Sequence, residues 1–520
     1  MLRKTFLFLI ILPYFVFSQQ LKTNWGEFYR SKGFTFDLLQ GNDSTIFSLT
    51  EKRKFIFSSY YINKIEHFEV VSSGKIQQKI GNSYGKIVFV HTMNNLPIVF
   101  LSDTYKNKQI LYAQTYSKNA TPSGPAIELM QTPLESGWGT KGTFSVIYSE
   151  NNHFFCVEYK STEDKQGTIN YNYKIFNTDF KTIHKGSYTT LVKKEAIDNQ
   201  LLTNTGDYFV TSKIYNQTEN FSFWGPEQQL HKVICKQVNK DTITPSEIEF
   251  QNQRIVDLQI ATNENGQISL AGSFAENEDK YNGVTGFFYK TFDYQKDIQI
   301  DAGMIHFPLA IITHDWSERA KRKIEKKQDQ SQEIPGLYEY KIQKVYTLKD
   351  SSVIALLEQT YVETQTYTDP RTGYISTRNI YHYNDIIALK IKNKNELDWI
   401  EIIQKKQTSV NDKGFYSSFS SVLRDSSLVL FFNDDLSNYD SEGNWKQKEN
   451  SLFQFNRPKT ILAICTLNLI KGAQNRSCYI NPNEKNSIFI TSLFKDSRSN
   501  KKLILFQKNM QKERIGILNY

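Results

Sequence analysis

The pentapeptide GNSYG, Gly81–Gly85, is the first stretch whose residue types could carry out chemistry. It matches the G-x-S-x-G pattern, in which a serine nucleophile lies on a sharp turn between a strand and a helix. The residues that follow, KIVFVHT, alternate as a strand does. The helix that the pattern requires is therefore missing, and we interpret the stretch as a turn between two β units.

Metal ligands are offered by one loop. The eight histidines form no H-E-x-x-H, H-x-H or cysteine-paired spacing, so the sequence does not favour zinc chemistry. NDDLSNYDSEGN, residues 433–444, holds Asp434, Asp435, Asp440 and Glu442 at short spacing. Calcium needs six to eight converging oxygens, and this loop departs from the EF-hand spacing. We therefore favour a solvated acidic loop, with a calcium site as the alternative, and expect no other cofactor.

Aromatic residues gather in YVETQTYTDPRTGYISTRNIYHYND, residues 361–385. The DPRTG stretch has turn chemistry at its midpoint, so the segment is predicted to be a long projecting hairpin. We predict that the binding residues are Trp316, Tyr367, Tyr374, Tyr381 and Tyr383, because aromatic rings on rigid strands suit sugars and partner side chains.

Four cysteines are too few for a disulfide scaffold. If Lys471 and Gly472 form a two-residue hairpin turn, Cys465 lies directly opposite Cys478. The sequence therefore predicts that these two residues could form a cross-strand disulfide.

The stretch HDWSERAKRKIEKKQDQ, residues 314–330, is the one long helical pattern. From Asp315 onward it carries six basic and four acidic residues, a net charge of only +2. Trp316, Ala320 and Ile324 form a narrow apolar stripe, enough to dock one side of a helix. We predict a salt-bridged helical flap and no nucleic-acid arm.

The elements that must position these residues are strands. Aromatics make up 14% of the chain and recur within short alternating runs separated by polar turns. A four-strand unit recurs, with starts near Phe34, Lys86, Thr143, Tyr208, Val256, Tyr340, Tyr416 and Ser487. We predict an all-β chain forming a β-propeller of seven or eight four-stranded blades, with one inserted helix. Two β-sandwich domains are the alternative.

The last unit offers only three good strands, whereas NWGEFYR, residues 24–30, is a spare strand. Pairing the two would close the ring and leave no open edge. Residues 19–520 are then a single propeller domain, with insertions at 313–333 (helix), 361–385 (long hairpin) and 433–458 (polar loop).

Residues 1–18 are expected to be a signal peptide, because Arg3 and Lys4 precede a short apolar run and Val16 and Ser18 supply a cleavage pattern. No later segment is long and apolar enough to be transmembrane. The net charge of +9 over 520 residues is mild, so no nucleic-acid partner is expected. We predict an exported protein of the periplasm, the outer-membrane surface or the extracellular space.

The segments IPGLYEYKIQKVYTLKDSSVIALLEQTY, YHYNDIIALKIKNKNELDWIEIIQKKQ and YSSFSSVLRDSSLVLFFND resemble a family of uncharacterised secreted β-propeller-like proteins of Bacteroidetes. The similarity is clearest over residues 256–433. It implies a propeller, export and a charged helical insertion ahead of PGLY, and it brings no activity and no catalytic residue.

Connections from second to third strand, and from one blade to the next, open on the same face of a propeller. The predicted insertions therefore cluster on one side, and loops on a rigid scaffold are where binding usually resides. We favour a non-enzymatic binding or scaffold protein of the cell envelope that holds an envelope protein or glycan on this face. The alternative is a glycan hydrolase or lyase with its site in the central funnel.

Overall fold

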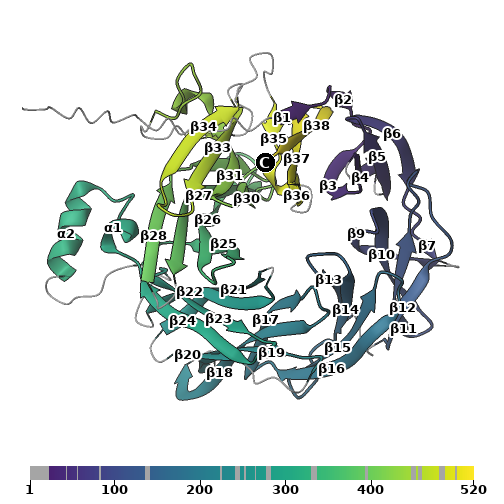
Figure 1. Cartoon of the computed structure of the whole chain (residues 1–520), viewed down its shortest axis with the longest axis horizontal. Coiled ribbons are helices and arrows are strands. Elements are labelled where there is room, and N and C mark those ends of the chain that lie inside the picture. The colour runs from purple at the N-terminus through teal and green to yellow at the C-terminus, as the bar shows by residue number, and fades with distance from the viewer. Residues whose placement is uncertain are drawn as a thin grey trace, which may run out of the picture.

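The described residues form eight large sheets, each built around antiparallel strands, that surround a central axis as the blades of a β-propeller (Figure 1). The computed structural model describes residues 23–520 apart from 43, 56, 81–82, 135–140, 223–224, 241–245, 251–252, 264, 277–282, 329–335, 393–395, 447–452, 455–459, 480–486 and 498–500. The predicted signal peptide lies outside the described residues.

Each blade has four strand positions, numbered from the axis outward. Blade 1 comprises β3 (Phe34–Gln40), β4 (Thr45–Lys54), β5 (Phe57–Glu66) and β6 (Glu69–Lys75). Blade 2 comprises β9 (Lys86–Met93), β10 (Leu96–Tyr105), β11 (Lys108–Thr115) and β12 (Ile127–Pro133). Blade 3 comprises β13 (Thr143–Tyr148), β14 (Phe154–Lys160), β15 (Thr168–Asn177) and β16 (Thr182–Leu191). Blade 4 comprises β17 (Glu195–Leu202), β18 (Tyr208–Ser222), β19 (Gly225–Gln237) and β20 (Ser246–Glu249).

The second half of the ring repeats this plan. Blade 5 comprises β21 (Gln253–Thr262), β22 (Gln267–Glu276), β23 (Gly286–Asp293) and β24 (Ile298–His306). Blade 6 comprises β25 (Tyr340–Thr347), β26 (Val353–Thr368), β27 (Ile375–Lys392) and β28 (Glu396–Ile403). Blade 7 comprises β30 (Phe419–Leu423), β31 (Ser427–Asp435), β33 (Thr460–Asn468) and β34 (Gln474–Tyr479). Blade 8 comprises β35 (Ile488–Phe489) and β36 (Lys495–Ser497) at the inner position, then β37 (Lys502–Asn509) and β38 (Lys512–Asn519).

The burial of a strand follows its position in the blade. The second strands, such as β22 (QISLAGSFAE) and β31 (SLVLFFNDD), are buried over nearly their whole length, because neighbouring blades cover both faces. The outer strand β16 (TIHKGSYTTL) is mostly exposed. Continuous apolar runs therefore mark the middle of a blade.

The core is divided into eight clusters, and each one lies between two adjacent blades. Ile354 and Leu356 of blade 6, for example, pack with Leu428 and Leu430 of blade 7. Burying each such side chain contributes roughly 1.5–3 kcal/mol. Because every blade shares its core with both neighbours, the alternative of two β-sandwich domains is wrong.

The ring closes through the amino-terminal strands, as predicted. β1 (Thr23–Trp25) and β2 (Tyr29–Arg30) both pair with β38 and supply the outer position of blade 8. Blade 8 then packs on blade 1, where Lys495 Nζ lies 2.8 Å from Asp37 Oδ1. The prediction of seven or eight blades resolves to eight.

One predicted unit boundary is wrong. Tyr208 begins the second strand of blade 4, and the first strand is β17, whose sequence is EAIDNQLL. Its central residues are Asp198, Asn199 and Gln200, so the apolar alternation that marks other strands is absent.

Candidate functional site

Three insertions cluster on one rim of the ring, beside blades 5 to 7. The first is the pair of helices α1 (Leu309–Ile312) and α2 (Glu318–Gln328) between β24 and β25, which Figure 1 shows outside the ring near β28. The second is the hairpin that extends β26 and β27, and the third follows β31. We call residues 309–328, 359–385, 407–410 and 436–446 the insertion face.

The hairpin at 361–385 is confirmed as a long projecting element. β26 and β27 stay paired from Val353 to the tip, whereas β28 reaches only the 386–392 part of β27. Beyond that point β29 (Gln407–Val410) pairs with Ile380–Tyr383 of β27, and β32 (Phe453–Gln454) pairs in parallel with β29. The insertion after β31 is thereby joined to the hairpin through a continuous sheet.

The tip of the hairpin is fixed by Asp369. Its Oδ1 accepts hydrogen bonds from the amides of Arg371 and Thr372 at 2.7 and 3.1 Å, and these bonds lower the pKa of the carboxyl. Gly373 has φ of +66°, a value that glycine adopts without strain. The turn therefore has one defined shape.

The predicted tyrosines divide between two environments. Tyr367 and Tyr374 are 63% and 70% exposed, so two of the expected rings do face water. Tyr381 and Tyr383 are half-buried, and they lie on the opposite face of the hairpin from Tyr367 because their cross-strand partners are Val362 and Thr360. The pKa of Tyr383 is raised by burial, as expected for a packed ring.

Sequence reasoning missed a second aromatic group on the Tyr367 side of the hairpin. Tyr361 stacks on His382 with ring centres 4.4 Å apart, and Tyr338 meets Tyr361 edge-on at 5.8 Å. Tyr338 is 55% exposed. The sequence signal that could have identified Tyr361 was the strand period of two, which places it on the same face as Tyr367.

A buried ion pair anchors the base of the hairpin. Lys405 Nζ lies 2.8 Å from Glu358 Oε1, and neither side chain has any exposed surface. Lys405 also donates to the carbonyl of Tyr383 and to Gln407 Oε1, while Ser418 Oγ donates to Glu358 Oε2. Desolvation lowers the pKa of Lys405, and the Glu358 charge opposes that shift. Blades 6 and 7 are tied together at this point.

The helical insertion, α1 and α2, is attached to the same base of the hairpin. His314 Nε2 lies 3.1 Å from Asp385 Oδ2, and Asp385 Oδ1 accepts the amide of Lys405. Burial alone would lower the pKa of His314, but the hydrogen bond to Asp385 and its charge outweigh burial, so the pKa is raised. The predicted helix is confirmed from Glu318 onward; Ile324 is buried and Trp316 is half-buried.

Three of the four acidic residues predicted as possible calcium ligands, Asp434, Asp435 and Asp440, have partners of their own. Asp434 is buried in an ion pair with Arg476, and the amide of Ser437 donates to Asp435 Oδ1. Asp440 accepts the amides of Glu442 and of Asn444 within its own turn. In the described part of the chain, no group of three or more His, Cys, Asp or Glu side chains could hold a metal ion. Calcium binding at this loop stays a prediction.

The predicted disulfide register is wrong. Cys465 lies opposite Arg476, and both Cys465 and Cys478 are free thiols. The hairpin turn is four residues long because Asn468 accepts the amides of residues 470 and 471 with its side chain and Gly472 takes a positive φ. This longer turn shifts the register by two residues from that of a two-residue turn.

Carboxylates on the inner strands, where a funnel enzyme would need them, already have partners. Asp37 pairs with Lys495 and Asp198 with Lys213. Asp257 accepts amides from its own strand and from blade 6. Of the GNSYG stretch, Gly81 and Asn82 lie outside the described residues, whereas Ser83 and Tyr84 form β8 between blades 1 and 2, and strand β9 follows.

No family model and no curated protein matches the chain. Among solved structures it is similar to the Dos1 propeller, with 7% identity, a TM-score of 0.33 and 95% of each chain covered. A variant of Synechocystis apocarotenoid oxygenase gives 9% identity and a TM-score of 0.31, covering 89% of this chain and 94% of that one. Prolyl oligopeptidase B from Galerina marginata gives 11% identity and a TM-score of 0.33, covering 94% of this chain and 55% of that one. These likenesses concern architecture alone.

Among the described helices, none is long and apolar enough to cross a membrane.

Proposed function

We propose that this chain is a non-enzymatic binding or scaffold protein of the cell envelope, which holds a protein or glycan partner on the insertion face. The observation that carries the proposal is the exposure of Tyr367 and Tyr374 at the end of a hairpin with a fixed base. Aromatic rings held in water on a rigid element lose little conformational entropy on binding.

The support beneath these rings favours recognition over a passive loop. A flexible loop would need no buried ion pair at its base, whereas here Lys405 and Glu358 sit beneath the hairpin and β29 widens it. The stacked Tyr361 and His382 extend the aromatic surface toward the blade. Such a surface suits the faces of sugar rings or the apolar side chains of a protein partner.

The test compares the wild type with a Tyr367→Ser/Tyr374→Ser variant. Both are immobilised and exposed to cell-envelope extract, and captured proteins and glycans are quantified by mass spectrometry. Loss of hot-spot aromatics costs about 2 kcal/mol, so the affinity for the main partner should fall by about thirtyfold.

Tyr84→Ser is the matched control, because Tyr84 is 76% exposed but lies between blades 1 and 2. It should capture the same partners as the wild type. Unchanged capture by the double variant would remove the insertion face from the proposal, and cleavage of a captured glycan by the purified protein would contradict the non-enzymatic part.

A further inference from the structure

The seam between blades 8 and 1 exposes three large apolar side chains at hairpin tips. Phe55 is 95% exposed and Phe57 is 73% exposed, both at the β4–β5 turn. Met510, at the β37–β38 turn, is 79% exposed. We call these three residues and the cations around them the seam patch.

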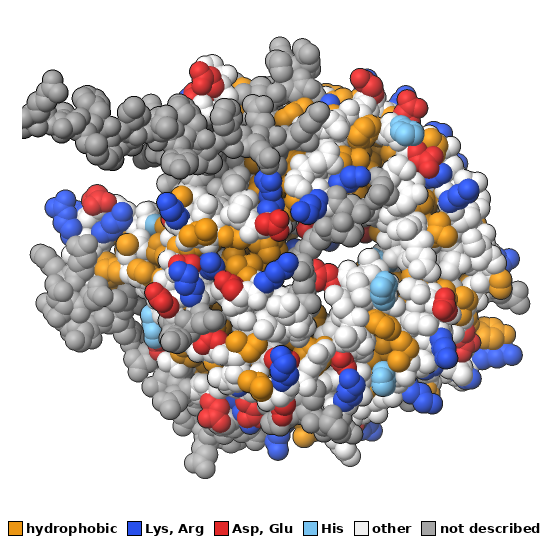
Figure 2. Space-filling model, in the orientation of Figure 1, with side chains coloured by type: hydrophobic (Ala, Val, Ile, Leu, Met, Phe, Trp, Pro, Cys, Tyr) orange, Lys and Arg blue, Asp and Glu red, His pale blue; other side chains and the backbone are white. Residues whose placement is uncertain are grey.

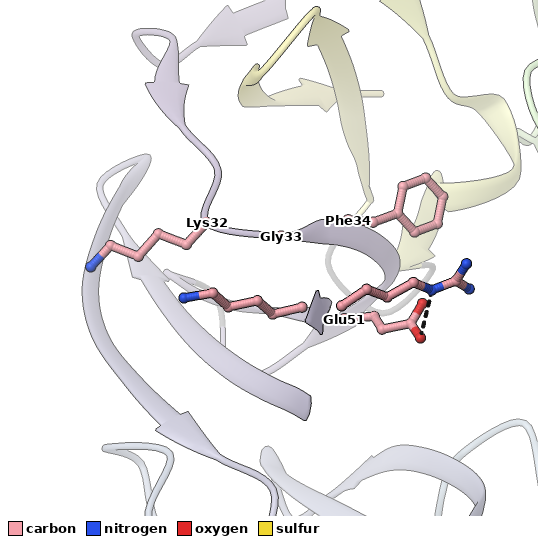
Figure 3. A pocket seen from close by; sticks show the side chains of 6 residues that line it. Lys32, Gly33, Phe34 and Glu51 are labelled. Carbon is pink, nitrogen blue, oxygen red and sulfur yellow. Dashed lines mark hydrogen bonds and ion pairs between the residues drawn. The ribbon is translucent and has the colours of Figure 1, made fainter. Parts of the chain in front are cut away.

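The segment of residues 31–33 runs between the two hairpins that carry these tips. The amide of Ser31 donates to the carbonyl of Gln511, and the chain then runs through Gly33, which lies against the backbone of Glu51. A cavity of about 550 Å³ follows this path, lined by Lys32, Gly33, Phe34, Glu51, Lys52 and Arg53. Figure 3 shows the side chains of Lys32 and Phe34 directed away from each other. Residues 31–33 therefore lie against both hairpins that carry the seam patch.

The seam patch is strongly cationic. Its exposed cations are Arg30, Lys32, Lys52, Arg53, Lys54 and Lys512. The one acid in the cavity wall, Glu51, is paired with Arg53 at 3.1 Å. Among the described residues, no ion pair neutralises the four lysines. Charge complementarity therefore calls for an anionic partner.

Phe55 holds its position at a conformational cost. Lys54 pairs directly with Phe57, so the turn has two residues, and Phe55 has φ of +55°. Two-residue hairpin turns favour Asn or Gly because bulky residues are strained at positive φ. The turn before β10 shows the usual solution, with Asn94 and Asn95 at φ of 50° and 62°. A fully exposed, strained phenylalanine has no packing role to explain it.

Both tips open on the same rim, since each joins the second and third strands of its blade. Two tips on one rim can meet a flat surface together. We propose that the seam patch docks the propeller on an anionic membrane surface, with Phe55, Phe57 and Met510 entering the interface and the surrounding cations lying among the lipid headgroups. Reversible membrane docking commonly combines these two signals, apolar insertion and basic charge.

The three apolar side chains of the seam patch favour a membrane over a soluble polyanion as the partner. A polyanion such as a nucleic acid or heparin would satisfy the cations, but it offers no apolar medium for three separated side chains. A lipid interface accommodates all three without requiring a complementary shape.

The experiment is sedimentation of the chain from Gln19, without the predicted signal peptide, with vesicles of phosphatidylcholine alone or mixed equally with phosphatidylglycerol. The wild type should pellet with the anionic vesicles and lose binding as salt is raised. Phe55→Asn/Phe57→Thr keeps residues suited to the turn and should weaken binding more than about tenfold. Lys52→Glu/Lys54→Glu should abolish the preference for anionic lipid.

The control is Ile470→Thr/Lys471→Glu, an exposed apolar and basic pair at a third-to-fourth strand turn, which opens on the opposite rim. It should bind as the wild type does. The proposal is overturned if the wild type does not pellet, if the Phe55→Asn/Phe57→Thr variant binds unchanged, or if heparin or inorganic phosphate at matched ionic strength displaces the protein fully.

Discussion

Lys405 and Glu358 show how single residues fix the insertion face. A buried ion pair is weak evidence for stability, since desolvation of both charges opposes their attraction. Here the remaining polar atoms also find partners, because Lys405 donates to Gln407 and Ser418 donates to Glu358. The pair therefore specifies where blades 6 and 7 meet, and removing one partner leaves a buried charge uncompensated.

We expect Lys405→Met to lower the free energy of unfolding by about 3–5 kcal/mol, because Glu358 would then be buried without its cation. Glu358→Leu should cost a similar amount. The double variant should cost clearly less than the sum of the two, which denaturant unfolding of all four proteins would measure. Additive costs would contradict a pair that acts as a unit.

At the residue scale, the sequence predicted which side chains are exposed better than it predicted which side chains form ion pairs with one another. Tyr367 and Tyr374 flank the DPRTG turn, and their position alone indicated that they would face water. Asp434 was grouped with nearby acids, whereas its partner is Arg476, which lies 42 residues later in β34 and is buried under three aromatic rings. Such a long-range partner leaves no mark in local spacing.

At the scale of elements, α1 and α2 are attached to the hairpin through one titratable contact. His314 and Asp385 lie 71 residues apart in sequence and join the helical insertion to the base of the hairpin. Because the folded state raises the pKa of His314, it favours the protonated ring. The contact therefore stabilises the protein below the unfolded pKa of about 6.5 and loses this contribution as the pH rises through the folded value.

We predict that His314→Gln destabilises the protein by about 1 kcal/mol at about pH 5.5 and by less at about pH 8.5. The measurement is the difference in free energy of unfolding between variant and wild type at each pH. Asp385→Asn should show the same trend, since it removes the charge that favours protonation. A difference that grows with pH would contradict this sign.

Elements were predicted well where their pattern was strong. The helix was recognised by its charge spacing, and the long hairpin by its turn. The inner strand β17 was missed because Asp198 and its neighbours are polar, and the register of the β33–β34 hairpin was wrong because the Asn468 side chain stabilises a longer turn. Both failures concern polar residues whose roles depend on what surrounds them.

At the scale of the whole molecule, the ring is held by eight hydrophobic clusters between adjacent blades and by the strand pairing that completes blade 8. Seven blades are continuous in sequence, and blade 8 alone combines strands from both ends of the chain. Trp25 of β1 reaches into blade 7, where its ring lies 5.8 Å from that of Tyr479, and Arg514 stacks over it at 4.4 Å. The closing strand therefore bridges two blades as well as covering an edge.

A chain that begins at Lys32 would lack β1 and β2 and would expose the edge of β38. We predict that its unfolding temperature falls by several degrees and that it self-associates, because an unpaired edge accepts further strands. A peptide spanning residues 23–31 should restore both the unfolding temperature and the monomeric state by strand addition. The same peptide carrying Trp25→Ser should restore neither, because the register would remain but the contacts with Tyr479 and Arg514 would be lost. Thermal unfolding and size-exclusion chromatography measure both properties, and a shortened chain as stable and monomeric as the parent would show that closure does not depend on these strands.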